Sequence, residues 1–434
     1  MMISMAVYSH SQQSCKLQKL NTVYFKSCGL ATKAFDTLHA FGIAMSQKTA
    51  YRCVNDLSVA AHQSLLRDIK KYPWIGSYDN INLGFKVYEQ RLSNHDCFDS
   101  GTAAMIIVIK DPLCKAPNPF DAQEKLTEGS KNPMMIRQIM LLEEAAAPHL
   151  CKYSIHHLLK ILVEAPQFAF DMYYYKDDPM FNHPESLKQL PTGKEYATCQ
   201  YMLNTVHIEE ASYEGNVKVL MEWLCQISIN TPDKKKRLAL ECVIVWVGDQ
   251  LTVSQLWGLK KFHSEDLNSF DRLDFLKEIP GWFHTEIAFE HSLHSQHYGT
   301  CTGHGLIYAF DLLQRKGLHS PSVQGTFHHS LQEGLYHISS ARFCDLWCTV
   351  SNVGSIESLH DSTPEELHRW ATIIIDKYGS TCALQELDEQ EDNDKKDDVF
   401  TQAVIWNRDI LDYLLLDEAI KTGDVGCIQD LLPH

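Results

Sequence analysis

The stretch 238–252, LALECVIVWVGDQLT, constrains the fold more than any other part of the chain. Within 239–247 the only charged residue is Glu241, and the end of this run is rich in β-branched and aromatic residues. A short apolar run that stops at a glycine predicts a buried central strand, and Gly248 stops this one. Asp249 follows directly, and open α/β sheets place their chemistry just beyond such strand ends. We therefore expect Asp249 at a functional edge of a sheet.

Length and composition limit the class of protein. A chain of 434 residues is long enough for more than one structural unit, and 44% hydrophobic with 22% charged residues is ordinary for a globular protein. No apolar run approaches the roughly 20 residues of a membrane span, and the N-terminus lacks the apolar core of a secretion signal. Fourteen cysteines without a framework spacing indicate a reducing compartment. We expect an intracellular protein with no membrane association.

The charge balance argues against a protein that coats nucleic acid. The formal net charge is −16, whereas proteins that bind nucleic acid non-specifically carry a basic surface. Part of the excess is local, because the segment 385–398, QELDEQEDNDKKDD, is dominated by acidic residues. This composition predicts a solvated, mobile linker. The sequence leaves open whether another part of the chain forms a basic face.

Residues 1–70 form a helical N-terminal region that offers two interpretations. A helix starting near Thr32 is followed by Gly42 and by a second helix for which Ser46 is the expected N-cap. Two helices around a glycine turn can be a DNA-binding helix-turn-helix or an ordinary helical hairpin. In the first case the residues exposed to DNA at the start of the second helix are Gln47, Lys48, Tyr51 and Arg52.

The next part of the chain predicts strands and then helices. Segments 74–78, 83–88 and 102–109 have strand patterns with short connections, which indicates an antiparallel meander with Asp79 at the end of its first strand. Prolines break the start of 111–234, and the rest of that segment is helical, so we interpret it as a helical insertion.

Beyond the opening stretch, a helix, a short strand at 282–284 and further helices follow. The region 346–434 is helical and contains the acidic linker.

Three strands, a helix, a strand, a helix, a short strand and a helix form the order of an RNase H-like fold. The chain is thus expected to be an α/β protein with a mixed sheet of three antiparallel strands plus parallel strands. Its core is split between 71–110 and 235–345, around the insertion 111–234. In this fold the first and fourth strands are parallel neighbours, so the strand ends carrying Asp79 and Asp249 meet.

Two carboxylates at one sheet edge raise each other's pKa unless a cation neutralises them. Oxygen ligands favour Mg²⁺ or Mn²⁺, and a third carboxylate on a later helix would complete a two-metal site for phosphoryl transfer. Glu333, which follows a loop and lies on a helix of the right order, is the leading candidate. Four further acids compete with it: Glu286, Glu290, Asp271 and Asp274.

Each of these residues also has an ordinary interpretation. An aspartate after a strand is common in turns. The spacing of His291, His294 and His297 could serve zinc with Cys301, yet surface or supporting roles are more usual. The helical spacing of Cys344 and Cys348 favours core packing.

Three other histidines are candidates for contact with the acidic site or with DNA. His284 follows the short strand and can face the acidic cluster, while His328 and His329 precede Glu333 and could contact phosphate. The chain has no Walker A, dinucleotide-binding or G-x-S-x-G motif, which disfavours nucleotide-driven motors, dehydrogenases and serine hydrolases.

A set of motifs resembles one known family. In order they are GIAMSQKTAYRCVNDL, YDNIN, VGDQLT, GWFH, LLQRKGL and GTFHHSLQEGLYH, and together they span roughly residues 30 to 430. This set is similar to the DUF6589 family, which is abundant in fungal genomes and associated with transposon-like genes. The resemblance implies a relative of DDE-type transposases of RNase H-like fold, with Asp79, Asp249 and Glu333 as the DDE residues. It also implies DNA as partner and a nuclear location, and the abrupt end of the chain implies a shortened copy.

The leading hypothesis is therefore a transposase-derived protein that cleaves and transfers DNA strands with Mg²⁺ or Mn²⁺, with a homo-oligomer left open. A catalytically inactive or domesticated DNA-binding or protein-interaction module is the first alternative. An RNase H-like nuclease unrelated to transposition is the second.

Overall fold

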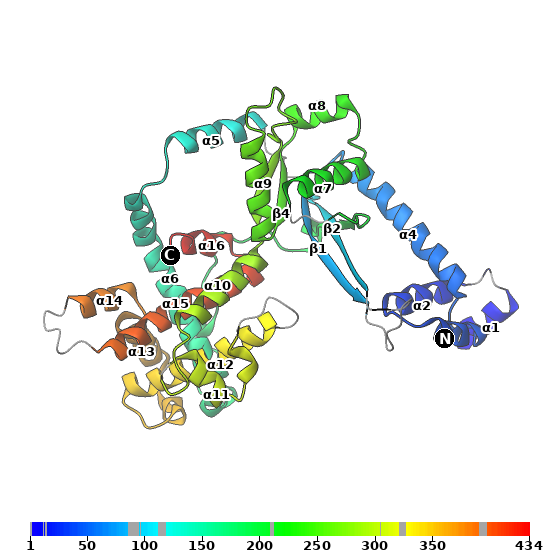
Figure 1. The fold of residues 1–434 in the computed structure, drawn as a ribbon. Helices are drawn as coiled ribbons and strands as arrows, with labels where there is room; N and C mark the ends of the chain where they lie inside the picture. Colours follow the sequence, from blue (N-terminus) through cyan, green and yellow to red (C-terminus); the bar gives the residue numbers. More distant parts are fainter. Residues whose placement is uncertain are drawn as a thin grey trace. The chain divides into compact units, whose positions relative to one another are not determined.

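The chain folds into two compact units. A computed structural model describes residues 2–11, 13, 15–85, 95, 97–111, 119–208, 212–303, 305–320, 327–389 and 397–434. The first unit comprises Met1–Lys125 and Gly193–Ile279, and the second comprises Leu126–Thr192 and Pro280–His434. The first contains the β-sheet, and we call it the sheet unit; the second consists of helices, and we call it the helical unit (Figure 1).

The sheet is mixed and has five strands. They are β1 (Trp74–Phe85), β2 (Cys97–Val108), β3 (Cys199–Met202), β4 (Ile244–Gly248) and β5 (Leu276–Pro280). Their order across the sheet is β3-β2-β1-β4-β5. β1 and β2 are antiparallel, as are β2 and β3, whereas β1 and β4 are parallel. The prediction of an α/β protein with a mixed sheet is confirmed, although the three antiparallel strands are not the three that the sequence indicated.

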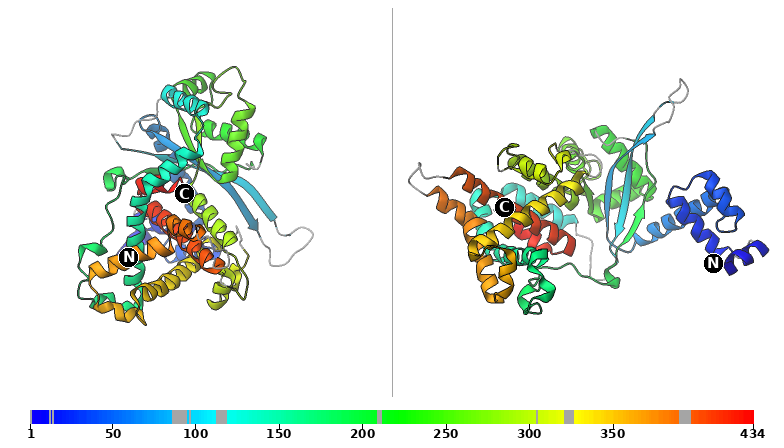
Figure 2. Two further views of the ribbon diagram at one scale, coloured as in Figure 1. Left: turned by 90° about the vertical axis from the view of Figure 1, so that its left-hand side faces the viewer. Right: turned by 90° about the horizontal axis from the view of Figure 1, so that it is seen from below.

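The predicted turn after Asp79 is wrong, because β1 continues through it. Asp79 pairs with Ala103 and Asn82 with Ser100, so the register with β2 runs the whole length of both strands (Figure 2). Cross-strand pairing overrides the turn preference of short polar residues. The strand predicted at 83–88 is therefore the end of β1 as far as Phe85, and 86–88 lie outside the described residues.

The third strand comes from a part of the chain predicted to be helical. β3 lies within 111–234. It pairs with β2, which corresponds to the strand predicted at 102–109. The remainder of this segment carries α5 (Pro119–Lys131), α6 (Ile136–Glu164) and α7 (Tyr213–Gln226). The segment is shared between the units, since the helical unit takes Leu126–Thr192 and the sheet unit continues from Gly193.

Two boundaries near the opening stretch also differ from the prediction. Residues up to Glu241 belong to α8 (Pro232–Glu241), where Pro232 occupies the first turn and helix-forming Lys, Arg, Leu and Ala follow. The buried strand is therefore the shorter β4. The strand predicted at 282–284 is wrong, because β5 ends at Pro280 and Trp282 begins α10 (Trp282–Gln296).

One face of the sheet carries the core of the sheet unit. Tyr78, Ile106 and Trp246 are almost completely buried on this face, where α7, α8 and α9 (Gln250–Phe262) pack with the end of α4. Gly76 lies directly against the ring of Trp246, so the bulky indole fits only because its strand neighbour has no side chain. The opposite face is half-buried at Ser77.

The N-terminal helices of the sheet unit are α1 (Met2–His10), α2 (Lys16–Ser27), α3 (Thr32–Ala40) and α4 (Gln47–Asp68). The Ser46 side chain accepts a hydrogen bond from the Thr49 amide, as expected of the N-cap. Phe35 and Ala50 are fully buried in a small core of their own. The helices α3 and α4 therefore lie where the sequence predicted two helices around Gly42.

The helical unit packs around α6, α12 (Phe327–Ser351) and α15 (Asp398–Thr422), with a core that includes Trp347 and Trp406. The other α-helices are α10, α11 (Leu306–Leu312), α13 (Pro364–Tyr378), α14 (Thr381–Asp388) and α16 (Val425–Leu431). Short 3₁₀ turns occupy Pro166–Phe168, Phe170–Met172, Pro179–Phe181, Lys316–Leu318 and Ile356–Asp361 here, and Lys194–Tyr196 in the sheet unit.

The acidic segment predicted as a linker is bounded by helices. Its first residues complete α14 and its last begins α15, while 390–396 lie outside the described residues. In the described ranges, none of the helices combines the length and the hydropathy that a membrane crossing requires.

Candidate metal centres

Asp249 lies where β4 passes into α9, and it forms the N-cap of that helix. Its Oδ1 accepts a hydrogen bond from the Thr252 amide at 2.6 Å. A side chain on Gly248 would approach the Thr252 side chain to 2.5 Å, so this turn needs a glycine. The sequence Gly-Asp-Gln-Leu-Thr therefore makes a tight strand-to-helix turn, and it presents a half-buried carboxylate at the end of β4.

Asp79 lies on the neighbouring strand β1, two residues beyond its last pair with β4. The parallel register pairs Ile75 with Val245 and Ser77 with Val247. Two more residues of the same register would set Asp79 opposite Asp249. Neighbouring strands are about 4.8 Å apart, and Asp249 itself lies one residue beyond β4, so the meeting of the two carboxylates stays a prediction from this register.

The environment of Asp79 suits a cation ligand. Its side chain is exposed and lies on the half-buried face of the sheet with Ser77. One carboxylate oxygen accepts a hydrogen bond from the next amide, Asn80 N, at 2.8 Å. With Asp249, the pair offers hard oxygen donors that solvent can reach, and this donor set fits Mg²⁺ or Mn²⁺.

Glu333, the third predicted carboxylate, lies on the surface of the helical unit. It is on α12, its side chain is 51% exposed, and Arg315 Nη1 lies 3.0 Å from its Oε2. The hydrogen bond from Arg315 lowers the pKa of Glu333. Its role as third ligand stays a prediction from sequence order. Among the competitors, Asp271 bonds Asn268 and Asp274 pairs with Arg272.

The residues predicted to contact DNA at α4 lie at the start of that helix. Lys48 and Arg52 are exposed, and Gln47 donates a hydrogen bond to Thr32 Oγ1 on the preceding helix. Tyr51 is 57% exposed, but Lys26 lies over its ring. Lys48 and Arg52 thus present a cationic pair near the start of α4, which is compatible with both interpretations of this hairpin.

The histidine array predicted as a zinc alternative is used for packing and pairing. His294 is buried, and its Nε2 lies 2.8 Å from the carbonyl oxygen of Leu318. His297 Nε2 lies 3.0 Å from Asp409 Oδ2. His284 is half-buried near the start of α10, and His329 is exposed on α12.

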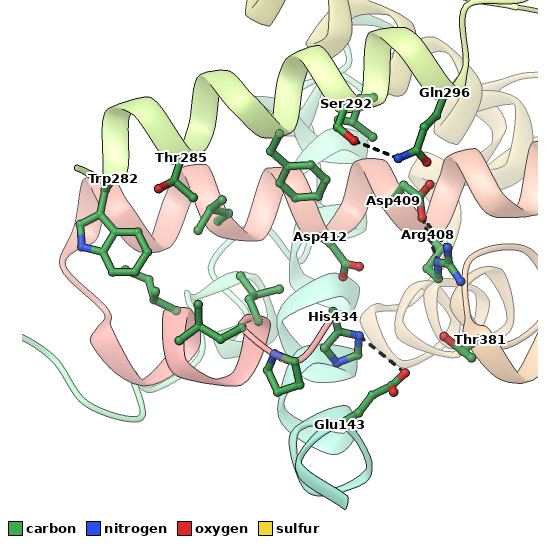
Figure 3. Close-up of a pocket in the computed structure, with 17 residues that line it drawn as sticks. Glu143, Trp282, Thr285, Ser292, Gln296, Thr381, Arg408, Asp409, Asp412 and His434 are labelled. Atoms are coloured by element: carbon green, nitrogen blue, oxygen red, sulfur yellow. Dashed lines mark hydrogen bonds and ion pairs between the residues drawn. The ribbon is translucent and has the colours of Figure 1, made fainter. Parts of the chain in front are cut away.

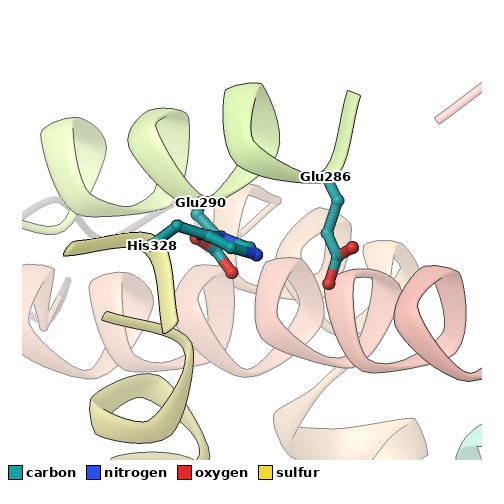
Figure 4. Close-up of side chains that lie close together, drawn as sticks. All are labelled: Glu286, Glu290 and His328. Carbon is teal, nitrogen blue, oxygen red and sulfur yellow. The ribbon is translucent and has the colours of Figure 1, made fainter. Parts of the chain in front are cut away.

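A different group comes together in the helical unit: Glu286, Glu290 and His328. One potential ligand atom from each lies within 4.8 Å of the other two, so these residues could hold a metal ion. The two glutamates are one turn apart on α10, and the imidazole comes from the first turn of α12 (Figure 4). His328 Nδ1 lies 2.7 Å from Glu290 Oε2. We call this group the Glu-Glu-His centre.

Burial perturbs the acids of the centre. Glu290 is completely buried and Glu286 is 6% exposed. Burial raises the pKa of Glu286 to about 7, with further contributions from a hydrogen bond to Asp417 and from its charge. Burial also raises the pKa of Glu290, although hydrogen bonds from Tyr413 and His328 oppose the shift. Strongly perturbed carboxyls in one place are typical of functional sites.

Sequence reasoning found the members of this centre without joining them. Glu286 and Glu290 were only competitors of Glu333, and His328 was considered for phosphate contact. The i, i+4 spacing on α10 was the available signal, since it places both carboxylates on one helix face. Asp417 and Tyr413, which line the same place from α15, were missed because nothing local in the sequence marks them.

Comparison with known protein families gives one match, which covers most of the chain. A family model described as a family of unknown function, DUF6589, matches residues 129–434. The chain belongs to the DUF6589 family. No curated protein and no solved structure matches it.

The DUF6589 match includes the whole of one candidate site and part of the other. Asp249 and all three members of the Glu-Glu-His centre lie within 129–434, whereas Asp79 lies before the matched range. The sequence resemblance to this family is thereby confirmed for most of the chain.

The DUF6589 region also contains a cavity in the helical unit, with a volume of about 670 Å³ (Figure 3). One side is apolar and includes Trp282 and Phe289, while Arg408, Asp412 and His434 line the other. Burial, with the nearby charge of Asp409, raises the pKa of Asp412 to about 7. The cavity is thus amphipathic, with a carboxyl that favours its neutral form.

Proposed function

We propose that this chain derives from a transposase and that its sheet is the core of an RNase H-like enzyme that cleaves and transfers DNA strands. The observation that carries the proposal is the register of β1 and β4. It supports a sheet edge at which Asp79 and Asp249 stand opposite each other. In the strand order β3-β2-β1-β4-β5 the first and fourth strands are neighbours, as the hypothesis of such a core requires.

The two aspartates would hold Mg²⁺ or Mn²⁺ at this edge. A divalent ion supplies charge stabilisation for phosphoryl transfer and lowers the pKa of a water ligand. In the first reaction, water attacks a DNA phosphodiester, and the bond to the 3′ oxygen breaks to leave a 3′-hydroxyl and a 5′-phosphate. In the second, that 3′-hydroxyl attacks another phosphodiester, whose own 3′ oxygen leaves. The role of this chain is to place acidic oxygen ligands on a rigid sheet edge.

The test is nicking of supercoiled DNA in Mg²⁺ or Mn²⁺ by the full chain and by Asp249→Asn. Asparagine keeps the N-cap and removes the charge, so the variant isolates the metal role. Asp233→Asn, an exposed acid in the first turn of α8, is the matched control. We expect metal-dependent nicking by the wild type and the control, and at least about a hundredfold loss in Asp249→Asn.

Two outcomes would contradict the proposal: no metal-dependent nicking by the wild type, or equal nicking by Asp249→Asn. Joining of a labelled 3′ end to a second DNA separates strand transfer from simple hydrolysis. Nicking without joining would favour a nuclease unrelated to transposition.

A second candidate is a non-catalytic DNA-binding module, favoured by the exposed Lys48 and Arg52 at the start of α4. In that case binding of duplex DNA weakens with salt, survives Asp249→Asn and falls on changing Lys48 and Arg52 to alanine. Equal binding by the double alanine variant would exclude α4 as the DNA contact.

A further inference from the structure

The Glu-Glu-His centre comes from two helices of one compact unit, and a third helix packs beside it. α10 contributes Glu286 and Glu290, α12 contributes His328, and α15 packs alongside both with Tyr413 and Asp417. Figure 4 shows the imidazole of His328 lying against the Glu290 carboxylate, with its ring directed toward Glu286. Metal sites in helical bundles are built in this way, from inward-facing carboxylates and imidazoles on neighbouring helices.

Three carboxylates are buried in this small volume. Glu286, Glu290 and Asp417 are 6%, 0% and 3% exposed. Lys421 neutralises Asp417 from the surface, with Nζ 2.6 Å from Oδ1. His328 is the cationic partner of Glu290 when it is protonated. Burying this much negative charge is costly unless a cation or a bound proton compensates it.

Side chains behind the acids hold them in place. Tyr413 donates to Glu290, and Gln332 Nε2 donates to Glu286 Oε1 at 2.8 Å and to Asp417 Oδ1 at 3.2 Å. Tyr336 donates to Asp417 from the next turn of α12. Supporting hydrogen bonds of this kind orient the carboxylates that bind metals in proteins, and they fix which oxygen faces the ion.

We propose that Glu286, Glu290 and His328 bind one divalent transition-metal ion, with Gln332 and Tyr413 orienting the two carboxylates. The convergence of the ligand atoms within 4.8 Å carries this assignment. It goes beyond the proposed strand-cleaving function, because these residues belong to the helical unit and the aspartate pair to the sheet unit.

The ligand types select the class of ion. Two carboxylates and one imidazole suit Mn²⁺, Fe²⁺ or Zn²⁺, whereas Mg²⁺ and Ca²⁺ prefer oxygen ligands alone. Three protein ligands leave a coordination position for water or a substrate group. One ion also neutralises the two buried glutamates at once, which a protonated His328 does only for Glu290.

The experiment uses the full chain carrying Asp249→Asn, so that the proposed ion of the sheet edge does not contribute. After removal of metals with a chelator, the protein is titrated by calorimetry with ZnCl₂, MnCl₂ and MgCl₂. We expect one Zn²⁺ or Mn²⁺ per chain, bound more tightly than Mg²⁺. Adding Glu290→Gln or His328→Gln should weaken this binding at least tenfold. Tenfold is the lower bound, because replacing even a residue that only orients a metal ligand typically weakens metal binding by that much.

His329→Gln is the matched control, because this neighbour on the same helix is exposed and lies outside the centre. It should bind the ion as the background does. Electron spin-echo spectroscopy of the Mn²⁺-loaded protein gives a second readout, which does not depend on affinity. A nitrogen coupling from an imidazole ligand should be present in the background and absent in His328→Gln.

Unchanged binding in both Glu290→Gln and His328→Gln, or a Mn²⁺ spectrum without nitrogen coupling, would overturn the assignment. Circular dichroism of each variant separates loss of a ligand from loss of the fold. His328 is 22% exposed at its side chain, so its replacement is the variant least disruptive to the core. Because Asp249→Asn is present throughout, failure here leaves the strand-cleaving proposal untouched.

Discussion

Asp249 has two roles that substitution can separate. Its carboxylate caps α9 through the Thr252 amide at 2.6 Å, and it is half of the proposed metal pair with Asp79. An asparagine side chain can accept the same amide hydrogen bond, but it brings no charge to a metal. The cap and the metal ligand therefore make different demands on the side chain.

We predict that Asp249→Asn changes the free energy of unfolding by only a few tenths of a kcal/mol, whereas Asp249→Ala costs about 1 kcal/mol because the cap is lost. Urea unfolding followed by circular dichroism measures both. Both variants should lose metal-dependent nicking. Equal destabilisation by asparagine and alanine would show that the cap contributes nothing to stability.

Asp412 gives a pH prediction for the helical unit. Burial raises its pKa from 3.8 to about 7, and the charge of Asp409 adds to the shift. As pH rises, the Asp412 carboxyl loses its proton at a lower pH in the unfolded chain than in the folded chain. Asp412 therefore lowers the free energy of unfolding increasingly between pH 3.8 and about 7, and the full destabilisation is present above pH 7. Asp412→Asn removes this cost.

The variant should therefore be more stable than the wild type at pH 8, by about 2 kcal/mol once solvent screening is allowed for, and the advantage should vanish near pH 4. Thermal unfolding at both pH values checks this. A constant difference at both pH values would mean that Asp412 does not titrate as described.

At the scale of elements, the contact of β1 with β4 depends on one glycine. A Cβ on Gly76 would lie 2.4 Å from the Cε3 and Cζ3 atoms of the Trp246 ring, inside the core of the sheet unit. Gly84, farther along the same strand, has open space where a Cβ would be. The same substitution at the two sites therefore differs in packing alone.

We predict that Gly76→Ala destabilises the protein by about 1–3 kcal/mol through overpacking, and that Gly84→Ala is neutral or slightly stabilising. Chemical denaturation of the two variants measures the difference. Comparable stability of the two would indicate that Trp246 moves aside at little cost, and that β1 and β4 are held less rigidly than described.

The elements that could be predicted are those with local signals. Ser46 predicted the start of α4, and Gly248-Asp249 predicted the end of β4. Both were predictable because caps and tight turns depend on residues close in sequence. The course of β1 through Asp79 could not be predicted, since its partners in β2 decide it. β3 has only the four residues Cys199–Met202, too few for a periodic pattern.

The candidate sites divide in the same way. The proposed aspartate pair comes from strand order, because it needs only that β1 and β4 be parallel neighbours, although Asp79 lies within β1 and not at its end. The Glu-Glu-His centre depends on tertiary contacts: Gln332 and Asp417, which touch in the structure, are 85 residues apart in sequence. Its assembly needed the packing of α10, α12 and α15, for which the sequence offers no pairing rule.

At the scale of the molecule, the chain has two compact units, each with its own candidate cation site. The candidate site of the sheet unit consists of the exposed Asp79 and the half-buried Asp249, which offer oxygen donors only. The helical unit offers two buried glutamates and a histidine. The ligand types predict overlapping preferences, with Mg²⁺ or Mn²⁺ at the sheet edge and Mn²⁺, Fe²⁺ or Zn²⁺ among the helices. Substitution of the ligands can therefore disable each site separately.

The central claim is that Asp79 and Asp249 together hold a divalent ion at the sheet edge. The most direct test is a crystal of the full chain grown with MnCl₂, with the ion located by its anomalous scattering. We predict a peak within about 2.0–2.3 Å of an oxygen of each carboxylate, which is lost in crystals of Asp249→Asn. A Mn²⁺-loaded crystal with no ion between these carboxylates, or with one bound by Asp249 alone, would contradict the claim.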